Sequence, residues 1–185
     1  DIVELLAKLS KANPKRLIDF YKEILDDIKL KRKKIDKKLK SYYVMGTPIF
    51  ALNTHRFENK LASFVGLEVL KLEKEGKPGI NISKETLISY NPDIVFISGF
   101  ISCKTEDFID YCQNHNININ ATKYKKVYKL PFGWDFGSVE WIFGLMYIAN
   151  VAYPHIYNFN IESKYFLFNN KKYAPLNKSF YAGIG

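Results

Sequence analysis

A short apolar run constrains the fold more than any other feature of the chain. Residues 94–97 read Ile-Val-Phe-Ile and lie between Asn91-Pro92-Asp93 and Ser98-Gly99. An apolar run of this length, bounded by Pro and Gly, predicts a buried strand. Further strand patterns fall at residues 42–45, 67–72 and 126–130, and helical patterns at residues 57–65, 83–89, 105–114, 138–153 and 161–168. This alternation predicts an α/β fold, a three-layer α/β/α lobe with a mostly parallel sheet covered on both faces.

One long helix is expected before the first strand. Asn13 is suited to cap it, Pro14 to begin it, and apolar residues recur at helical spacing up to Lys40. Such a helix would be about 40 Å long. Its single apolar stripe predicts a strut lying along a body; a coiled coil is the alternative. A short apolar helix is expected at residues 2–10, and the boundary near Ser41 divides residues 1–40 from residues 41–185.

The chain is basic, and the excess charge is local. Its net charge is +9, and much of it lies in residues 29–40. A solvated helix face explains such a run, and so does a surface for phosphates or an anionic membrane. No apolar stretch of about 18 residues predicts a membrane span.

Three loops are expected at the carboxyl ends of the strands, where ligands gather in parallel sheets. The first, residues 46–56, ends in Asn53, Thr54, His55 and Arg56 just where a helix begins. His55 can ligate a metal, and Arg56 can bind a carboxylate or an oxyanion. The alternative is that Asn53 or Thr54 caps the helix while His55 and Arg56 are solvated.

The other two loops are rich in aromatic residues. Residues 99–104 present Phe100, with Ser102 as a candidate helix cap, and residues 131–138 carry Phe132, Trp134 and Asp135 between glycines. Exposed rings suit a large, partly apolar ligand. Packing of the rings into the core is the alternative in both loops. Asp135 can bind a cation or a partner's arginine.

Signals for catalysis are weak. The chain has no GxSxG, Walker A, GxGxxG or HExxH motif, and its three histidines are scattered. Cys103 and Cys112 are separated by a helical pattern that places them about 10 Å apart, too far for a disulfide. We interpret both as buried or unreactive thiols.

Several segments together resemble one family of transport proteins. Residues 82–97 resemble the "ISxExLLxxNPDxII" segment of the solute-binding proteins for iron-siderophores, haem and cobalamin. Residues 44–48 with 58–66 are similar to that family's strand and "nELielaG" helix. Residues 127–131, Trp134, Ser138, Glu140, 144–149 and Tyr153-Pro154 are similar to its closing stretch. The succession covers almost the whole chain.

The resemblance implies the carboxy-terminal lobe of an extracytoplasmic protein, often a lipoprotein, that binds a metal chelate or metal oxyanion between two lobes. It implies an ABC-transporter permease as partner, an amino-terminal lobe that this chain lacks, a monomer, and no specific nucleic acid. Residues 14–40 take the place of the inter-lobe helix. Trp134 matches a ligand-packing aromatic, and His55 and Arg56 lie in a ligand-binding loop. Asp135 and Glu140 are the acids nearest the permease-docking position. No prosthetic group is implied.

Two rival functions remain. A metal chelatase built on a similar scaffold would need a second His or carboxylate beside His55. A basic interaction module would use residues 29–40 on nucleic acid or anionic lipid, with steep salt dependence.

Overall fold

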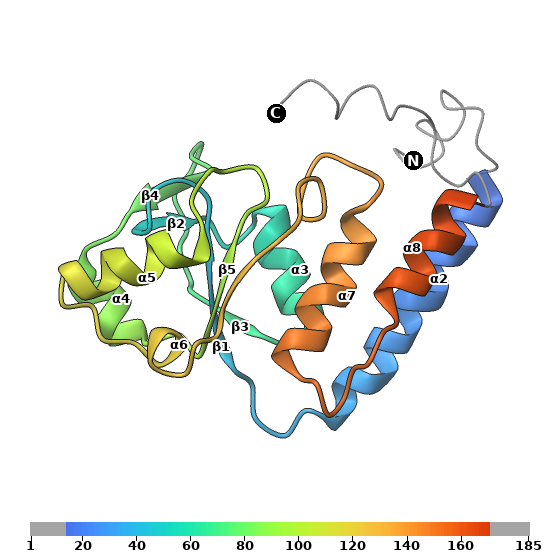
Figure 1. The fold of residues 1–185 in the computed structure, drawn as a ribbon, viewed down its shortest axis with the longest axis horizontal. Coiled ribbons are helices and arrows are strands. Elements are labelled where there is room, and N and C mark those ends of the chain that lie inside the picture. The colour runs from blue at the N-terminus through green and yellow to red at the C-terminus, as the bar shows by residue number, and fades with distance from the viewer. Residues whose placement is uncertain (1–13, 171–185) are drawn as a thin grey trace. The chain divides into compact units, whose positions relative to one another are not determined.

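The computed structural model describes residues 14–170, which fall into two compact units (Figure 1). One unit is Ile28–Phe159; the other comprises the described residues 14–27 and 160–170. The predicted boundary near Ser41 therefore differs from the observed division. Among the described residues, no helix combines the length and apolarity needed to cross a bilayer. The helix expected at residues 2–10 lies outside the described residues.

The larger unit is built on a six-stranded sheet. Its strands are β1 (Lys40–Val44), β2 (Phe50–Leu52), β3 (Glu68–Val69), β4 (Gly79–Asn81), β5 (Ile94–Ile97) and β6 (Val127–Lys129). The order is β4-β2-β1-β5-β6, with β3 also paired to β1. β1 is parallel to β3 and β5, and β5 to β6, whereas β2 is antiparallel to both its neighbours. The predicted mostly parallel sheet is confirmed.

Helices cover both faces of this sheet, as the alternation predicts (Figure 1). They are α3 (Phe57–Val65), α4 (Lys84–Tyr90), α5 (Thr105–Asn114), α6 (Asn120–Lys123) and α7 (Trp141–Ala152). Every residue of β5 is fully buried. Because side chains alternate along a strand, Val95 and Ile97 face one layer, where they join Leu87 of α4 and Phe108 of α5 in a core cluster. Phe96 faces the opposite layer.

Most predicted elements are found within a residue or two of their expected bounds. The helices at residues 57–65 and 105–114 match, and Ser83 caps α4 by accepting a hydrogen bond from the Thr86 amide. Three elements were not predicted, namely β2, β4 and α6. β2 and β4 have three residues each and α6 has four, too few for a periodic pattern to emerge.

The long first helix is shorter than expected. α2 spans Pro14–Lys31, and after a 3-10 turn, Arg32–Lys34, the backbone is extended at Ile35. The Ile35 side chain reaches Gly66, where any added Cβ would lie 2.5 Å from its Cδ1 atom. In a continued helix the like charges of Lys31 and Lys34, three residues apart, would also repel one another. The prediction of one helix over residues 14–40 is therefore wrong for residues 32–40.

The smaller unit pairs the first part of α2 with α8 (Ile161–Asn170). Lys164 Nζ lies 2.8 Å from Glu23 Oε1, and the rings of Phe20 and Phe168 are 5.7 Å apart. These contacts hold the two helices together.

Candidate functional site

The carboxyl ends of β1, β5 and β6 lie side by side. The Ser98 amide donates to the Val44 carbonyl at 2.9 Å, and the Leu130 amide donates to the Ile97 carbonyl at 2.9 Å. The loops that follow these strands therefore leave the sheet from one edge, which we call the carboxyl edge. Parallel pairing of the strands brings the starts of the three predicted loops together. The first predicted loop, however, contains β2, so residues 53–56 follow a strand that is antiparallel to β1.

Asp135 fastens the third loop to that edge. Its Oδ2 atom accepts hydrogen bonds from the Tyr43 hydroxyl at 3.0 Å and from the Gly99 amide at 3.2 Å. The residue is 0% exposed. The permease-docking role predicted for Asp135 does not fit this burial, because its carboxylate contacts the strand ends and not the surface. Its role here is to hold the loop.

Burial also changes the acidity of this group. Desolvation raises the pKa of the Asp135 carboxyl, while hydrogen bonds from Ser98, Tyr43 and the Gly99 amide act in the opposite direction. The same burial, with the nearby Asp135 charge, raises the pKa of Tyr43 well above its ordinary value. The tyrosine therefore stays protonated and keeps donating to Asp135.

Three phenylalanines form a partly exposed group above this anchor, which we call the aromatic cluster. Phe100, Phe132 and Phe136 are 41%, 49% and 42% exposed. The ring centroids of Phe100 and Phe132 are 4.6 Å apart, and those of Phe100 and Phe136 are 6.1 Å apart in an edge-to-face arrangement. Two loops thus present one apolar surface, as expected for Phe100 and Phe132. Phe136 belongs to it as well and was not among the predicted site residues.

Arg56 joins the first loop to the aromatic cluster. Its guanidinium carbon lies 5.2 Å from the centroid of the Phe136 ring, a cation–π distance. Its Nη2 atom donates to Oε1 of Glu58, a fully buried residue, at 3.1 Å. Arg56 Nε and Glu58 Oε2 are buried without a hydrogen-bond partner among the described residues. The carboxylate therefore orients the arginine, whose charge is shared between Glu58 and the cluster.

Trp134 lies deeper than the phenylalanines. It is half-buried, and its ring lies 5.7 Å from that of Phe143 in α7. The Trp134 carbonyl approaches Gly144 so closely that a Cβ there would lie 1.8 Å from its oxygen. Core packing accounts for these contacts. Glu140, the other predicted docking acid, is half-buried immediately before α7.

Asn53 and Thr54 use their side chains within the protein. Thr54 Oγ1 donates to the Leu72 carbonyl at 2.9 Å and accepts from the Leu72 amide at 2.7 Å. Asn53 Nδ2 donates to the Lys74 carbonyl at 3.0 Å, while its Oδ1 accepts from the His55 amide at 3.1 Å. Both side chains therefore bind the segment between β3 and β4, and neither caps α3.

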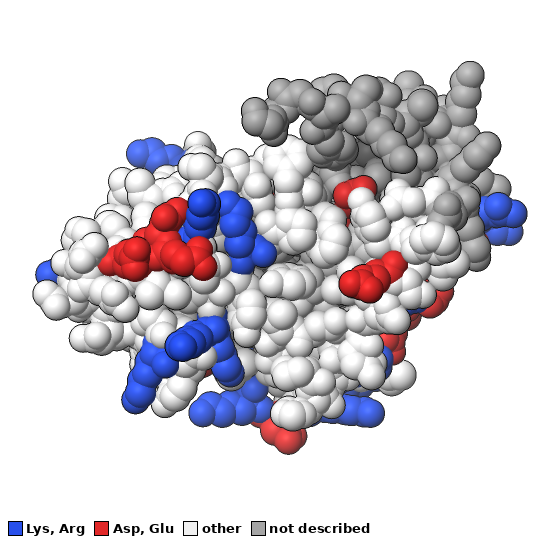
Figure 2. Space-filling model, viewed as in Figure 1, with Lys and Arg blue, Asp and Glu red and all other residues white. Residues whose placement is uncertain are grey.

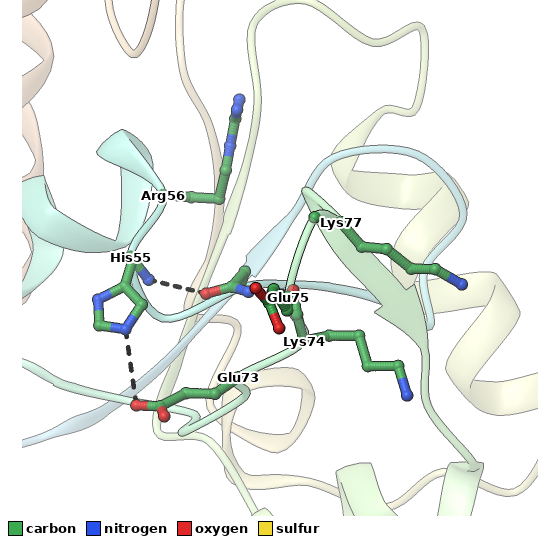
Figure 3. A pocket seen from close by; sticks show the side chains of 8 residues that line it. His55, Arg56, Glu73, Lys74, Glu75 and Lys77 are labelled. Atoms are coloured by element: carbon green, nitrogen blue, oxygen red, sulfur yellow. Dashed lines mark hydrogen bonds and ion pairs between the residues drawn. The ribbon is translucent and has the colours of Figure 1, made fainter.

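The side chains of His55 and Arg56, both predicted to bind ligand, point in different directions. Figure 3 shows Arg56 pointing away from His55 and Glu73. His55 Nε2 lies 3.6 Å from Glu73 Oε1, and both side chains are 73% exposed. They line an open depression of about 440 Å³ together with Asn53, Arg56 and residues 74–77. Glu73 is a partner for His55 that sequence spacing did not identify.

The structure places no complete metal site around His55. Within residues 14–170, no group of three or more His, Cys, Asp or Glu side chains is arranged to hold a metal ion. The histidine and Glu73 offer two donors, so a metal bound there would take its remaining ligands from a chelator or from another surface. Ser102, the last predicted contact, is exposed; α5 begins after Lys104, whose amide donates to Asp107 Oδ2 at 2.7 Å.

Comparison with known proteins identifies the fold. No protein-family model and no curated protein matches the sequence. Solved structures do match: the chain has the fold of a single lobe of periplasmic solute-binding proteins, the class implied by the sequence resemblance.

Three solved structures illustrate the likeness. A periplasmic solute-binding protein from Veillonella parvula has a TM-score of 0.79 at 22% identity, covering 96% of this chain and 56% of its own. Ceue from Helicobacter pylori with Ni(II) bound has a TM-score of 0.76 at 23% identity, covering 94% and 57%. The molybdate-binding protein MolA from Haemophilus influenzae, bound to molybdate, has a TM-score of 0.73 at 16% identity, covering 95% and 56%. The chain thus spans little more than half the length of these proteins.

Proposed function

We propose that this chain supplies the carboxy-terminal lobe of the solute-binding component of an ABC importer. The aromatic cluster and Arg56 would form one wall of its ligand cleft. The observation that carries the proposal is a cation–π contact between Arg56 and Phe136, one of three partly exposed rings at the carboxyl edge of the sheet. Apolar surface left in water at a place where α/β folds bind ligands favours a ligand that covers it.

The same surface suggests a class of ligand. Rings that lie edge to face offer area to a planar or aryl-bearing molecule, and the guanidinium beside them favours negative charge. An anionic metal chelate with aromatic arms, such as a ferric catecholate, meets both requirements; haem meets them too. A small oxyanion would use Arg56 and leave the rings uncovered. We therefore favour a metal chelate over a bare metal ion or oxyanion as the cargo.

The cleft requires a second wall. The neighbours' greater length supports a partner lobe that faces the carboxyl edge. We further propose an extracytoplasmic location and delivery of the ligand to a permease, with Glu140 as the remaining candidate for docking. A lipid anchor remains a prediction from the resemblance.

Titration of the protein with its partner lobe present tests the proposal, with ferric tricatecholate as the ligand and quenching of tryptophan fluorescence as the readout. We expect saturable quenching, because Trp134 lies in the loop that carries Phe132 and Phe136. Arg56→Ala should weaken binding about tenfold or more, since it removes the charge that faces the ligand. Tyr124→Ala, an exposed aromatic elsewhere in the unit, is the matched control and should bind normally. Absence of binding to ferric tricatecholate, haem, cobalamin and molybdate would reject the function.

A further inference from the structure

The opposite edge of the same sheet is strongly basic. Residues 32–40 carry six cations against one acid, and residues 120–126 carry three cations and no acid. These two segments therefore account for almost the whole net charge of +9. They precede β1 and β6, so both lie at the amino ends of parallel strands.

Pairing with β5 brings the two segments together. The Asp93 amide donates to the Lys40 carbonyl at 2.8 Å, and the Val95 amide donates to the Lys126 carbonyl at 2.9 Å. Because β5 separates β1 from β6 by two strand spacings, the segments enter the sheet about 10 Å apart. Figure 2 shows Lys and Arg side chains along the lower border of the face drawn, where Figure 1 places the segment leading into β1.

Most of these lysines are exposed and uncompensated. Lys33, Lys34, Lys37 and Lys38 are all exposed, and no ion pair joins them to an acid within residues 14–170. The adjacent Asp93 carboxylate is already occupied, since it accepts hydrogen bonds from the Lys40 amide and the Asn120 side chain. We call Lys33, Lys34, Lys37, Lys38, Lys123, Lys125 and Lys126 the basic edge.

Two large apolar side chains accompany the charge. Leu30, in the last turn of α2, is 63% exposed, and Tyr124, between Lys123 and Lys125, is 60% exposed. Lysines mixed with a leucine and a tyrosine suit the interface of an anionic bilayer, where the ammonium groups meet headgroups and the apolar groups enter the acyl boundary. A nucleic-acid backbone would engage the lysines and give Leu30 no favourable partner.

We propose that the basic edge rests on anionic phospholipid headgroups. The carboxyl edge lies at the far ends of the same strands, about 16 Å away along β1. A protein held by its basic edge would therefore keep the aromatic cluster turned away from that bilayer while it collects ligand, and would have to leave the headgroups before the cluster could face the permease. This attachment is independent of ligand identity, so its test can succeed or fail separately from the proposed function.

Co-sedimentation with lipid vesicles tests the attachment. The probes are vesicles of phosphatidylcholine alone and vesicles with phosphatidylglycerol as about one third of the lipid. We expect binding to the anionic vesicles only, and loss of that binding at high salt. Combining Lys33→Gln, Lys34→Gln, Lys37→Gln and Lys38→Gln should lower the partition coefficient about 600-fold, because each lysine near the surface contributes about fivefold.

A matched variant separates location from net charge. Lys60, Lys71, Lys84 and Lys104 are exposed lysines outside the basic edge, and changing all four to Gln removes the same charge. This control should bind within about threefold of the wild type. Leu30→Ser with Tyr124→Ser should lower vesicle binding about tenfold while leaving binding to a DNA duplex unchanged. Circular dichroism should show equal thermal unfolding of all variants.

The proposal would be overturned by equal binding to both vesicle types or by an equal loss in the two quadruple variants. Binding to a DNA duplex that is tighter than binding to anionic vesicles would instead assign the basic edge to nucleic acid.

Discussion

The two edges of the sheet are ends of the same strands, yet they are built differently. At the carboxyl edge, the exposed aromatic cluster lies over buried polar groups that have protein partners: Arg56 pairs with Glu58, and Asp135 accepts from Tyr43 and Gly99. At the amino edge, most lysines of the basic edge are exposed, and none of them has an acid partner within residues 14–170. Buried hydrogen bonds hold the carboxyl edge in position, whereas the lysines of the amino edge are held mainly by their own backbone.

This difference has a consequence for mutation. Removing the partner of a buried polar group lowers the stability of the fold, whereas solvated lysines contribute little to stability. Substitutions of the buried polar groups at the carboxyl edge should therefore affect folding and ligand binding together, whereas substitutions of the exposed lysines at the amino edge should affect neither.

The largest effect is expected at Asp135. Asp135→Ala leaves the buried Tyr43 hydroxyl and the Gly99 amide without their acceptor and should lower the free energy of unfolding by about 3 kcal/mol. Urea denaturation measures this. Asp36→Ala, an exposed acid at the amino edge, is the control and should cost less than about 0.5 kcal/mol. Equal costs for the two would mean that Asp135 does not anchor the loop.

Arg56→Ala should come next. It leaves the Glu58 carboxylate buried without its cation, but Arg56 itself is partly solvated, so we expect a loss of about 2 kcal/mol. Glu58→Gln in the same chain should recover part of that loss, because the remaining group is neutral. A double-mutant cycle of urea unfolding measures the coupling. Strictly additive effects would argue against the pair.

Phe136→Ala should separate binding from folding. Because the ring is partly exposed, its loss should cost less than about 1 kcal/mol of stability. The dissociation constant for ferric tricatecholate should nevertheless rise about tenfold. Tyr124→Ala at the amino edge should leave the ligand's dissociation constant unchanged. A larger effect of Tyr124→Ala on that constant would reverse the roles of the edges.

The smallest effect concerns pH. Burial raises the pKa of Asp135 above its ordinary value of 3.8, so the folded protein takes up this proton at higher pH than the unfolded chain does. The stability contributed by the group is therefore full below pH 3.8 and declines as the pH rises through the folded-state pKa. The free energy of unfolding of the wild type minus that of Asp135→Asn, measured in urea across this pH range, should decrease as the pH rises. An increase would contradict the burial argument.

The sequence predicted the framework better than the surface. The run at residues 94–97 is apolar enough to identify β5, and parallel pairing then follows from the alternation of strands and helices. The three-residue strand Phe50–Leu52 has no such pattern, so the sequence does not predict it. The helix predicted over residues 14–40 ends at Lys31 in the structure, because apolar spacing alone does not reveal where the basic run interrupts a helix.

Side-chain direction could not be predicted. His55 and Arg56 are neighbours in sequence, but His55 lies beside Glu73 and Arg56 lies over Phe136. The backbone of the turn before α3 sets these two directions. The burial of Asp135 was equally hidden, since only the assembled strand ends supply Tyr43 and Gly99 as its donors. Aromatic exposure in the loops was the part of the site that composition did indicate.

The central claim is that ligand binds at the aromatic cluster and Arg56. Amide chemical-shift mapping with gallium tricatecholate, a diamagnetic stand-in for the ferric chelate, tests this most directly. We predict that the largest shifts will fall in residues 99–102 and 131–138 and at Arg56, with the amides of residues 32–40 unchanged. Shifts confined to residues 73–77 and His55, or to the basic edge, would contradict the account.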